Sequence, residues 1–419
     1  MRGAVAALIM SALLAAPAIA QDSSTEPRTE KAPKASAVFE HPSVTVGGLK
    51  MDARGLLQTN ATDSDASNST NDGQVNLAHR RIGVDGSFRK VLSFQIEGEL
   101  DTPGPWRDVY ADYRQLDVFR VKAGQFKLPF SLDRNTGAAN LDFAFRSESA
   151  SEIAPGRRIG VMAHGRFWKR TLEYEAGFFP GARPDPTAPY GGPALERRMG
   201  AGRLSVRPFN RVKSSLGNLH LAAAFTAGLQ SEGISDMRGR TALGTKFFQR
   251  AYWVKGLRRR TGFEAQWQPG PASVTWEYAR ISDQRLDQGI GGQDLSPLNG
   301  AGAYLSGTWA ITGGSKARGV DKPRRPLFQG GVGAVEVAAR VESLRYGSRL
   351  DDPQAASNPR ALAPLGGSDH LVTAGVNWYV NRWIKAQFDA IHETARSPSI
   401  APAGRSSFWG RAFAIQLTI

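Results

Sequence analysis

The sequence predicts a transmembrane antiparallel β-barrel, and three observations lead to this fold class. Apolar and polar residues alternate with a period of two along nearly the whole chain after residue 43. The connectors between the alternating segments are unequal in length, and the alternation continues to the last residue, Ile419. At about 23 residues per strand and connector, the 376 residues from Val44 to Ile419 have room for about 16 strands.

The first 43 residues differ in composition from the rest. Arg2 precedes an apolar stretch and the small-residue triplet Ala18-Ile19-Ala20, which together predict a signal peptide at 1–20, cleaved before Gln21. Its apolar core is shorter than the about 20 residues of a membrane-spanning helix. Residues 21–43 are rich in Ser, Thr, Glu, Lys and Pro, which predicts a flexible periplasmic leader. The barrel is therefore expected at 44–419, in a protein exported from the cytoplasm.

The strand pattern is clearest in five segments, at 92–100, 119–124, 263–268, 335–342 and 384–389. Successive side chains of a strand point to opposite faces, so each segment has one apolar and one polar face. A soluble sandwich with its apolar face inward would show the same alternation. A run of roughly 350 residues is long for a soluble all-β domain and favours a membrane barrel.

The connectors and the chain end favour the same fold. Outer-membrane barrels have short periplasmic turns and longer external loops. A tight connector is expected at 86–90, and long polar ones at 60–73, 182–197, 283–300, 313–328 and 347–369. A chain that ends inside a strand is expected to close the barrel, because an open edge in lipid leaves backbone groups unpaired. Aromatic residues near segment ends fit interfacial girdles, or equally an ordinary core: Trp168, Tyr174, Trp253, Trp267, Trp276, Tyr278, Trp309, Trp378, Tyr379 and Trp409.

Composition argues against several classes of function. There is no cysteine, so neither a disulfide nor a thiolate metal site can form. The six histidines form no metal-spaced pair and stand in no nucleophile motif, so we expect no catalytic residue, metal or cofactor. The formal net charge is +15, but export and the even dispersion of the bases argue against a nucleic-acid partner.

A set of short runs, in a fixed order, resembles a known family. The runs are Ala78-His79-Arg80-Arg81-Ile82-Gly83-Val84-Asp85-Gly86, Asp108-Val109-Tyr110-Ala111-Asp112-Tyr113, Gly124-Gln125-Phe126-Lys127-Leu128-Pro129-Phe130, Phe145-Arg146-Ser147, Pro155-Gly156-Arg157-Arg158-Ile159-Gly160-Val161 and Asn377-Trp378-Tyr379-Val380-Asn381. They resemble the phosphate-selective porin O and P family of Gram-negative outer membranes. The resemblance is strong over 78–165 and moderate from 372 to the end. It implies a homotrimeric barrel whose third loop folds inward to narrow the pore, and whose basic lumenal residues guide anions.

Eight bases are the candidate constriction residues: Arg81, Arg120, Lys122, Lys127, Arg134, Arg146, Arg157 and Arg158. The first three lie on the polar faces of their segments. The next three flank 131–145, where strand alternation is weak and the inward loop is expected, and the last two follow that loop. A pore lined with bases concentrates anions, and arginine donates paired hydrogen bonds to phosphate oxygens. Each base could instead be a solvated charge with no role in selectivity.

Two features limit the preference to anions in general. The phosphate-selective relatives carry lysines along the inward loop, whereas residues 135–145 contain no base and one acid, Asp142. Acids on the polar faces could also pair with the bases: Glu97, Glu99, Asp108, Asp112, Glu336 and Glu342. The runs at 258–260 and 322–325 are expected at the surface, near anionic lipid headgroups or lipopolysaccharide.

The sequence therefore predicts an outer-membrane porin, a passive channel for small hydrophilic solutes that prefers anions such as phosphate. The alternative is a barrel that acts mainly as a surface interaction protein or adhesin through its long loops. A soluble periplasmic β protein is the third interpretation.

Overall fold

The computed structural model describes residues 42–65, 73–100, 103–181, 193–248, 251–312, 323, 325–348, 359–362, 364–397 and 405–419. The predicted signal peptide and all but the last two residues of the predicted leader lie outside these ranges and stay predictions. Every strand of the described residues lies in the unit His41–Ile419.

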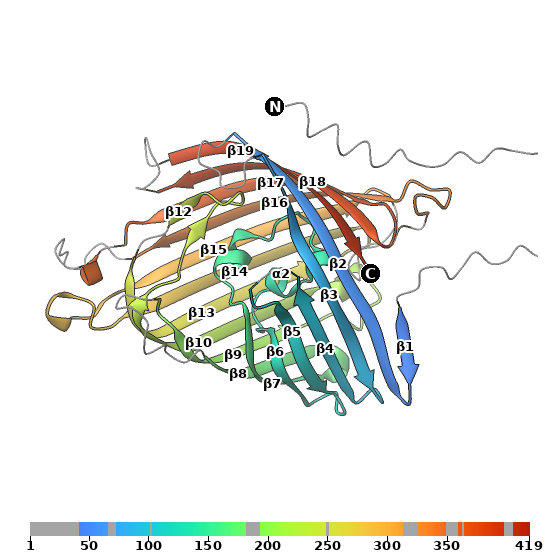
Figure 1. The fold of residues 1–419 in the computed structure, drawn as a ribbon, viewed down its shortest axis with the longest axis horizontal. Coiled ribbons are helices and arrows are strands. Elements are labelled where there is room, and N and C mark those ends of the chain that lie inside the picture. The colour runs from blue at the N-terminus through green and yellow to red at the C-terminus, as the bar shows by residue number, and fades with distance from the viewer. Residues whose placement is uncertain are drawn as a thin grey trace, which may run out of the picture. The chain divides into compact units, whose positions relative to one another are not determined.

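Sixteen antiparallel strands form a closed barrel, which confirms the predicted fold class and strand number (Figure 1). The strands are β2 (Leu49–Ser64), β3 (Gln74–Phe88), β4 (Leu92–Glu99), β5 (Trp106–Tyr113), β6 (Arg120–Lys127), β7 (Arg157–Phe167), β8 (Leu172–Pro180), β9 (Glu196–Val206), β10 (His220–Ile234), β13 (Trp253–Trp267), β14 (Ala272–Arg285), β15 (Leu295–Ala310), β16 (Ala334–Gly347), β17 (Gly367–Tyr379), β18 (Ile384–Arg396) and β19 (Arg405–Thr418). Each pairs with its neighbour along the chain, so the barrel is an up-and-down meander.

The last strand closes the barrel as the sequence predicted. β19 pairs with Leu56–Ser64 of β2, and the backbone of Ile419 exchanges two hydrogen bonds with Gly55 at 3.0 and 3.1 Å. A short additional strand, β1 (Ser43–Val46), pairs with the start of β2, beyond the part that β19 covers. The backbone groups at both edges of the sheet are therefore paired, as a barrel in lipid requires.

The two faces of each strand have opposite character. On β16, Val337 and Val341 point outward and are exposed, whereas Glu336, Arg340 and Glu342 point inward and are buried. This inversion of a soluble core, with apolar residues outside and charges inside, identifies a lipid-facing barrel. The predicted alternation is therefore confirmed. Within the described residues, no helix is both long and apolar enough to cross a membrane.

The connectors differ at the two ends of the barrel. Short turns at 89–91, 168–171, 268–271 and 380–383 lie at one end. Longer connectors at 128–156, 181–195, 235–252 and 348–366 lie at the other. Two sequence expectations were wrong in part. Half of 283–300 belongs to β14 and β15. The connector that contains 313–328 leaves β15 at the end with the short turns, because β15 runs toward that end.

The girdle prediction is confirmed for only some aromatic residues. Trp168, Trp276, Trp309 and Trp409 are exposed on the outer surface, whereas Trp253 and Tyr379 are buried. The arginine run at 258–260 also differs from expectation. Arg258 and Arg260 are buried and point inward, because alternate residues of β13 share a face, and only Arg259 points outward. In the run at 322–325, two of the four residues lie outside the described ranges.

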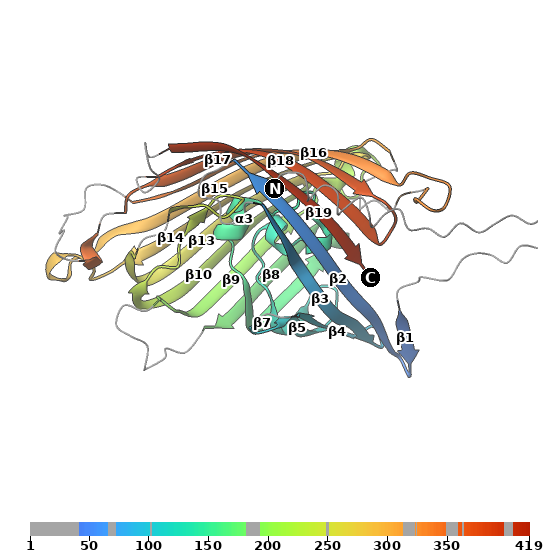
Figure 2. The same cartoon turned by 45° about the horizontal axis from the view of Figure 1, so that its top comes forward.

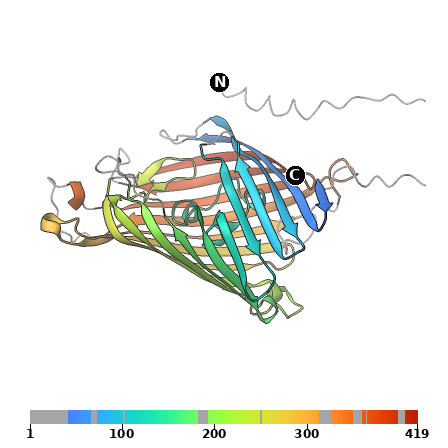
Figure 3. The same cartoon turned by 60° about the horizontal axis from the view of Figure 1, so that its bottom comes forward.

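The connector between β6 and β7 lies inside the barrel, as predicted for 131–145 (Figures 2 and 3). It spans 128–156 and contains α2 (Leu132–Asn135), η1 (Ala138–Asn140) and α3 (Glu148–Glu152). We call it the inward loop. It contacts β14, β15 and β16 through α3 and reaches β18 and β19 through η1, so it crosses the lumen.

Candidate functional site

Carboxylates on the far wall hold the inward loop by its backbone. Glu277 of β14 accepts hydrogen bonds from the amides of Leu132 and Asp133, at 3.0 and 2.6 Å, at the start of α2. Glu342 of β16 accepts from the amide of Glu148 at 2.8 Å, at the start of α3. These bonds satisfy helix amides that have no partner within the helix, and a carboxylate suits that end of a helix electrostatically.

Further wall groups hold the middle of the loop. Asp389 of β18 accepts from the amide of Ala144 at 2.7 Å. The Nζ of Lys385 donates to the carbonyls of Ala139 and Leu141, at 3.1 and 2.9 Å, and Asn377 donates to the carbonyl of Asp142 at 2.9 Å. The backbone of the inward loop therefore forms hydrogen bonds with side chains of one wall, that of β14 to β18. These bonds fix the position of the loop in the lumen.

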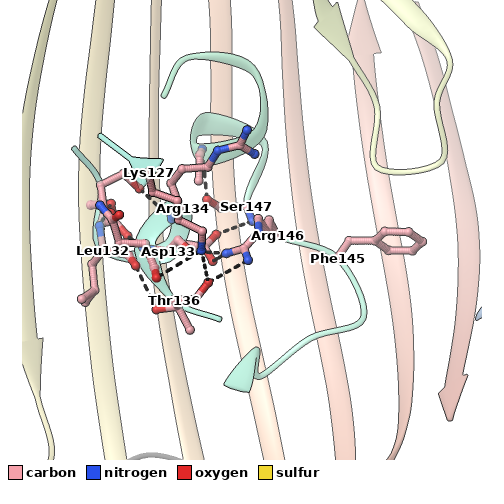
Figure 4. Close-up of polar contacts among 12 residues, drawn as sticks. Lys127, Leu132, Asp133, Arg134, Thr136, Phe145, Arg146 and Ser147 are labelled. Atoms are coloured by element: carbon pink, nitrogen blue, oxygen red, sulfur yellow. Dashed lines mark hydrogen bonds and ion pairs between the residues drawn. The ribbon is translucent and has the colours of Figure 1, made fainter. Parts of the chain in front are cut away.

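On its other side, the loop is held by two of the candidate bases (Figure 4). Lys127 donates to the carbonyls of Asn135 and Thr136 at 3.2 and 3.1 Å. Arg146 donates to the carbonyl of Thr136 at 2.8 Å, to the Asp133 carboxylate at 3.3 Å and to the Asp133 carbonyl. These cations lie at the carbonyl end of α2, where positive charge is stabilising. Both residues therefore shape the loop as well as carry charge.

Arg134 differs from its neighbours in the cluster. Within the described residues its guanidinium has no hydrogen-bond acceptor or carboxylate partner, and the side chain is only partly buried. Burial lowers the pKa of Arg134, and the nearby positive charges of Arg146 and Arg157 lower it further. Asp133 and Glu152 are near enough to offset part of this effect, but neither contacts the guanidinium. Because an arginine stays protonated at neutral pH even so, Arg134 presents a positive charge with no contacting carboxylate among the described residues.

The remaining candidates each have a partner. Arg81 donates to Glu99 at 2.7 Å, and Arg157 donates to Asp108 at 2.6 and 3.0 Å. Arg158 donates to Glu196 at 2.5 Å, and Arg120 pairs with Asp117. Lys122 lies 4.7 Å from the ring centroid of Tyr110. Five of the predicted lumenal acids thus pair with basic groups, since Asp112 also pairs with Arg114 at 2.7 Å, Glu97 with Arg54 at 3.9 Å, and Glu342 with Arg340.

The structure gathers only part of the candidate set at the inward loop. Arg81, Lys127, Arg134, Arg146 and Arg157 lie within electrostatic reach of one another. With Arg107, which contacts Glu99 at 3.3 Å, they form a group that we call the basic cluster. Three acids pair with it directly, Glu99, Asp108 and Asp133, which leaves an excess of positive charge. Arg120, Lys122 and Arg158 lie elsewhere on the wall of β6 and β7.

Sequence reasoning missed Arg107 because a register shift lies beside it. Between Ile96 and Gly98 the pairing of β4 with β5 slips, so simple alternation does not predict that Arg107 reaches Glu99. Sequence reasoning also missed Glu277 and Asp389. A lumenal acid that binds the backbone of a loop has the same sequence pattern as a lumenal acid that faces water. The strand pattern identifies the face of such a residue but not its partner.

A second segment also folds inward. The connector from β10 to β13 carries the hairpin β11 (Gly239–Arg240) and β12 (Lys246–Phe248), which contacts β16 and β17. The ring of Phe248 stacks on Tyr346 with centroids 4.7 Å apart, and the amide of Ala242 donates to Glu393 at 3.0 Å. The aromatic pair Phe247-Phe248, inside this polar connector, was the available signal for the packing.

Between the inward loop and the wall of β13 to β16 lies a cavity of about 380 Å³. Its lining includes the charged residues Asp133, Asp142, Arg207 and Arg340 and several residues with hydroxyl or amide side chains. Such a lining suits water and hydrophilic solutes. Within the described ranges, no three His, Asp or Glu side chains lie close enough together to hold a metal ion.

Comparisons with solved structures show the same architecture at low sequence identity. OmpT, an outer-membrane protein of Vibrio cholerae, aligns with a TM-score of 0.57 and 11% identity, over 90% of this chain and 99% of that one. The outer-membrane channel DcaP of Acinetobacter baumannii gives 0.55 and 10%, over 90% and 99%. OmpF of Salmonella typhi, in a complex with daunomycin, gives 0.55 and 9%, over 90% and 100%.

No curated protein matches the sequence significantly. A family model, however, matches residues 50–403, which is nearly the whole barrel. The closed barrel, the inward third loop and this match agree with the resemblance seen in the sequence. The chain belongs to the phosphate-selective porin O and P family and is an outer-membrane channel.

Proposed function

We propose that this channel is a passive porin that prefers small anions, phosphate among them, over cations. The observation that carries the proposal is the basic cluster at the inward loop, where six bases face three paired acids. Charges inside a narrow, low-dielectric passage act strongly on a passing ion, so a net positive constriction raises the local concentration of anions.

Arg134 is the group best suited to meet a permeating anion. Its guanidinium has no acceptor among the described residues, so its donors are available to an oxyanion. The planar fork can donate two parallel hydrogen bonds to phosphate. Arg146 and Arg157 donate to groups of the protein itself and contribute mainly their charge.

The experiment is a planar-bilayer recording with Arg134→Glu. The substitution changes the charge at the constriction by two without removing a hydrogen bond that holds the loop. The cation-to-anion permeability ratio, calculated from the zero-current potential, should therefore rise several-fold. The matched control is Arg259→Glu, which makes the same charge change on the outer face of β13. A shift of equal size in both variants would contradict the assignment of Arg134 to the pore.

The alternative of an adhesin with a blocked pore has one observation in its favour. The inward hairpin β11–β12 packs aromatic side chains against β16 and narrows the lumen further. Ohmic current steps from purified protein separate the two functions, because a plugged barrel gives none. We infer no enzymatic activity for the chain.

We also infer that the protein assembles as a homotrimer in contact with outer-membrane lipid and lipopolysaccharide. The trimer is supported by the family and by the similar OmpT of Vibrio cholerae, which is recorded in a trimer form. The lipid contact is supported by the apolar outer face. Crosslinking in intact membranes tests the trimer directly.

A further inference from the structure

A groove at the connector ends of β16, β17 and β18 has the features of a site for a lipid phosphate. It has a volume of about 500 Å³ and lies over β16, β17 and β18. Its lining comprises Arg345, Tyr346, Gly366, Gly367, Ser368, Arg396 and Ser397. No acidic residue contributes to this lining, which makes the groove positive.

The strand register brings the two arginines together. Arg345 is the direct partner of Ser368, and Ser368 is the direct partner of Arg396, so the three residues form one row across three strands. With neighbouring strands about 4.8 Å apart, the Cα atoms of the two arginines lie about 10 Å apart. Two extended side chains at this separation can both reach a single phosphate group between them.

Both arginines are exposed and have no carboxylate partner within the described residues. This contrasts with the lumen, where nearly every base near the inward loop is paired. Two unpaired guanidinium groups on a lipid-facing wall repel each other unless an anion lies between them. The hydroxyl of Ser368 offers a further hydrogen-bond donor in the same row.

The residues next to this row follow the layers of a membrane lipid. Toward the middle of the barrel, the next outward row contains Ser343 and His370, which are direct partners. The row after it contains Val341 and Val372, which are also direct partners and are 49% and 51% exposed. The order is therefore charged, polar and then apolar, as for a headgroup phosphate, its linking region and its acyl chains.

The position of the groove indicates the leaflet. Arg345 and Arg396 stand at the ends of β16 and β18 that lead into connectors, opposite the end with the short turns. In an outer-membrane barrel this is the external end. We propose that Arg345, Ser368 and Arg396 form a binding site for the phosphorylated headgroup of lipopolysaccharide. This inference rests on the outer-membrane location and not on anion preference.

The test uses the full-length protein, purified in detergent and stripped of lipid, with lipid A as the probe and native mass spectrometry as the readout. Arg345→Glu with Arg396→Glu should weaken lipid A binding by at least about tenfold, since two charge-assisted contacts are replaced by repulsion. The matched control is Arg259→Glu with Arg280→Glu, which reverses two outward charges on β13 and β14, away from the groove. The control pair should bind lipid A like the unmodified protein.

Three results would overturn the proposal. Equal loss in both pairs would mean that diffuse surface charge binds the lipid, and no loss in either would mean that lipid A binds elsewhere. Complete displacement of lipid A by millimolar inorganic phosphate would assign the groove to free phosphate. The Arg345→Gln with Arg396→Gln pair repeats the test if charge reversal impairs folding. Channel current should be unchanged in all variants, so a failure of the porin proposal is visible separately.

Discussion

Glu277 illustrates, at the scale of single residues, how a lumenal acid positions the inward loop. Its carboxylate accepts the amides of Leu132 and Asp133 and the hydroxyl of Tyr304, the last at 2.5 Å. Three donors converge on a residue that is almost fully buried. The Glu277 carboxylate, which would otherwise attract cations, therefore binds and positions the inward loop.

We therefore predict that Glu277→Gln loosens the inward loop. The amide offers one acceptor oxygen in place of two and brings donors that face other donors, which should cost about 1–3 kcal/mol. Limited proteolysis should cut the loop faster, and the channel current should become noisier. Glu173→Gln, at a surface ion pair with Arg166, is the control and should leave both unchanged. If the Glu277 variant is cleaved at the same rate as the unmodified protein, Glu277 does not hold the inward loop in place.

Glu148, at the start of α3, makes the stability of this region depend on pH. Burial raises the pKa of Glu148 well above its usual range, and the nearby Glu342, Glu393 and Glu152 raise it further. A carboxyl whose pKa is higher in the folded than in the unfolded state binds more protons when folded. Its contribution is therefore complete at low pH and is lost as the pH rises through the folded-state pKa.

Glu148→Gln should remove that loss, because the amide cannot ionise. The free energy of unfolding of the unmodified protein should fall as the pH rises above about 4.5, the ordinary pKa of the group, and the variant should show a smaller slope. Urea titrations at a series of pH values, read by heat-modifiable gel migration, measure both curves. Parallel curves would show that Glu148 does not titrate in this window.

The strands are the elements that the sequence predicted best, because a period of two fixes the face of every residue at once. The row formed by Leu305, Val341 and Val372 on adjacent strands lies on the outer face of the barrel and is exposed. This predicts that Val341→Arg costs about 2–4 kcal/mol at the membrane midplane. Gln95→Arg, on the lumenal face, should fold nearly normally. Equal tolerance of the two changes in refolding titrations would mean that the register is wrong by one residue.

The loops were harder to predict, for identifiable reasons. The place of the inward loop follows from the weak alternation at 131–145, but its path depends on contacts with residues more than a hundred positions away, such as Glu277 and Asp389. The inward hairpin β11–β12 was missed because its aromatic residues have no period. Arg258 and Arg260 were misplaced because three consecutive bases resemble a loop, although alternate members pair inside the barrel with Asp283 and Glu196.

For the whole molecule, the division of charge across the lumen matters more than the net charge of +15. One acid on each of β14, β16 and β18 accepts hydrogen bonds from the backbone of the inward loop, whereas the basic cluster on the opposite side has more bases than paired acids. We expect a permeating ion to pass close to the bases that no carboxylate contacts. The proposed anion preference rests on this asymmetry.

The zero-current potential of the unmodified channel in a potassium chloride gradient tests this claim most directly. We predict a potential of the sign set by chloride, so that anions are more permeant than cations, and a preference that weakens as ionic strength rises and screening shortens. Replacing chloride by phosphate should keep the sign. A potential of the opposite sign, set by potassium, would contradict the account, because the basic cluster would then not control the passage.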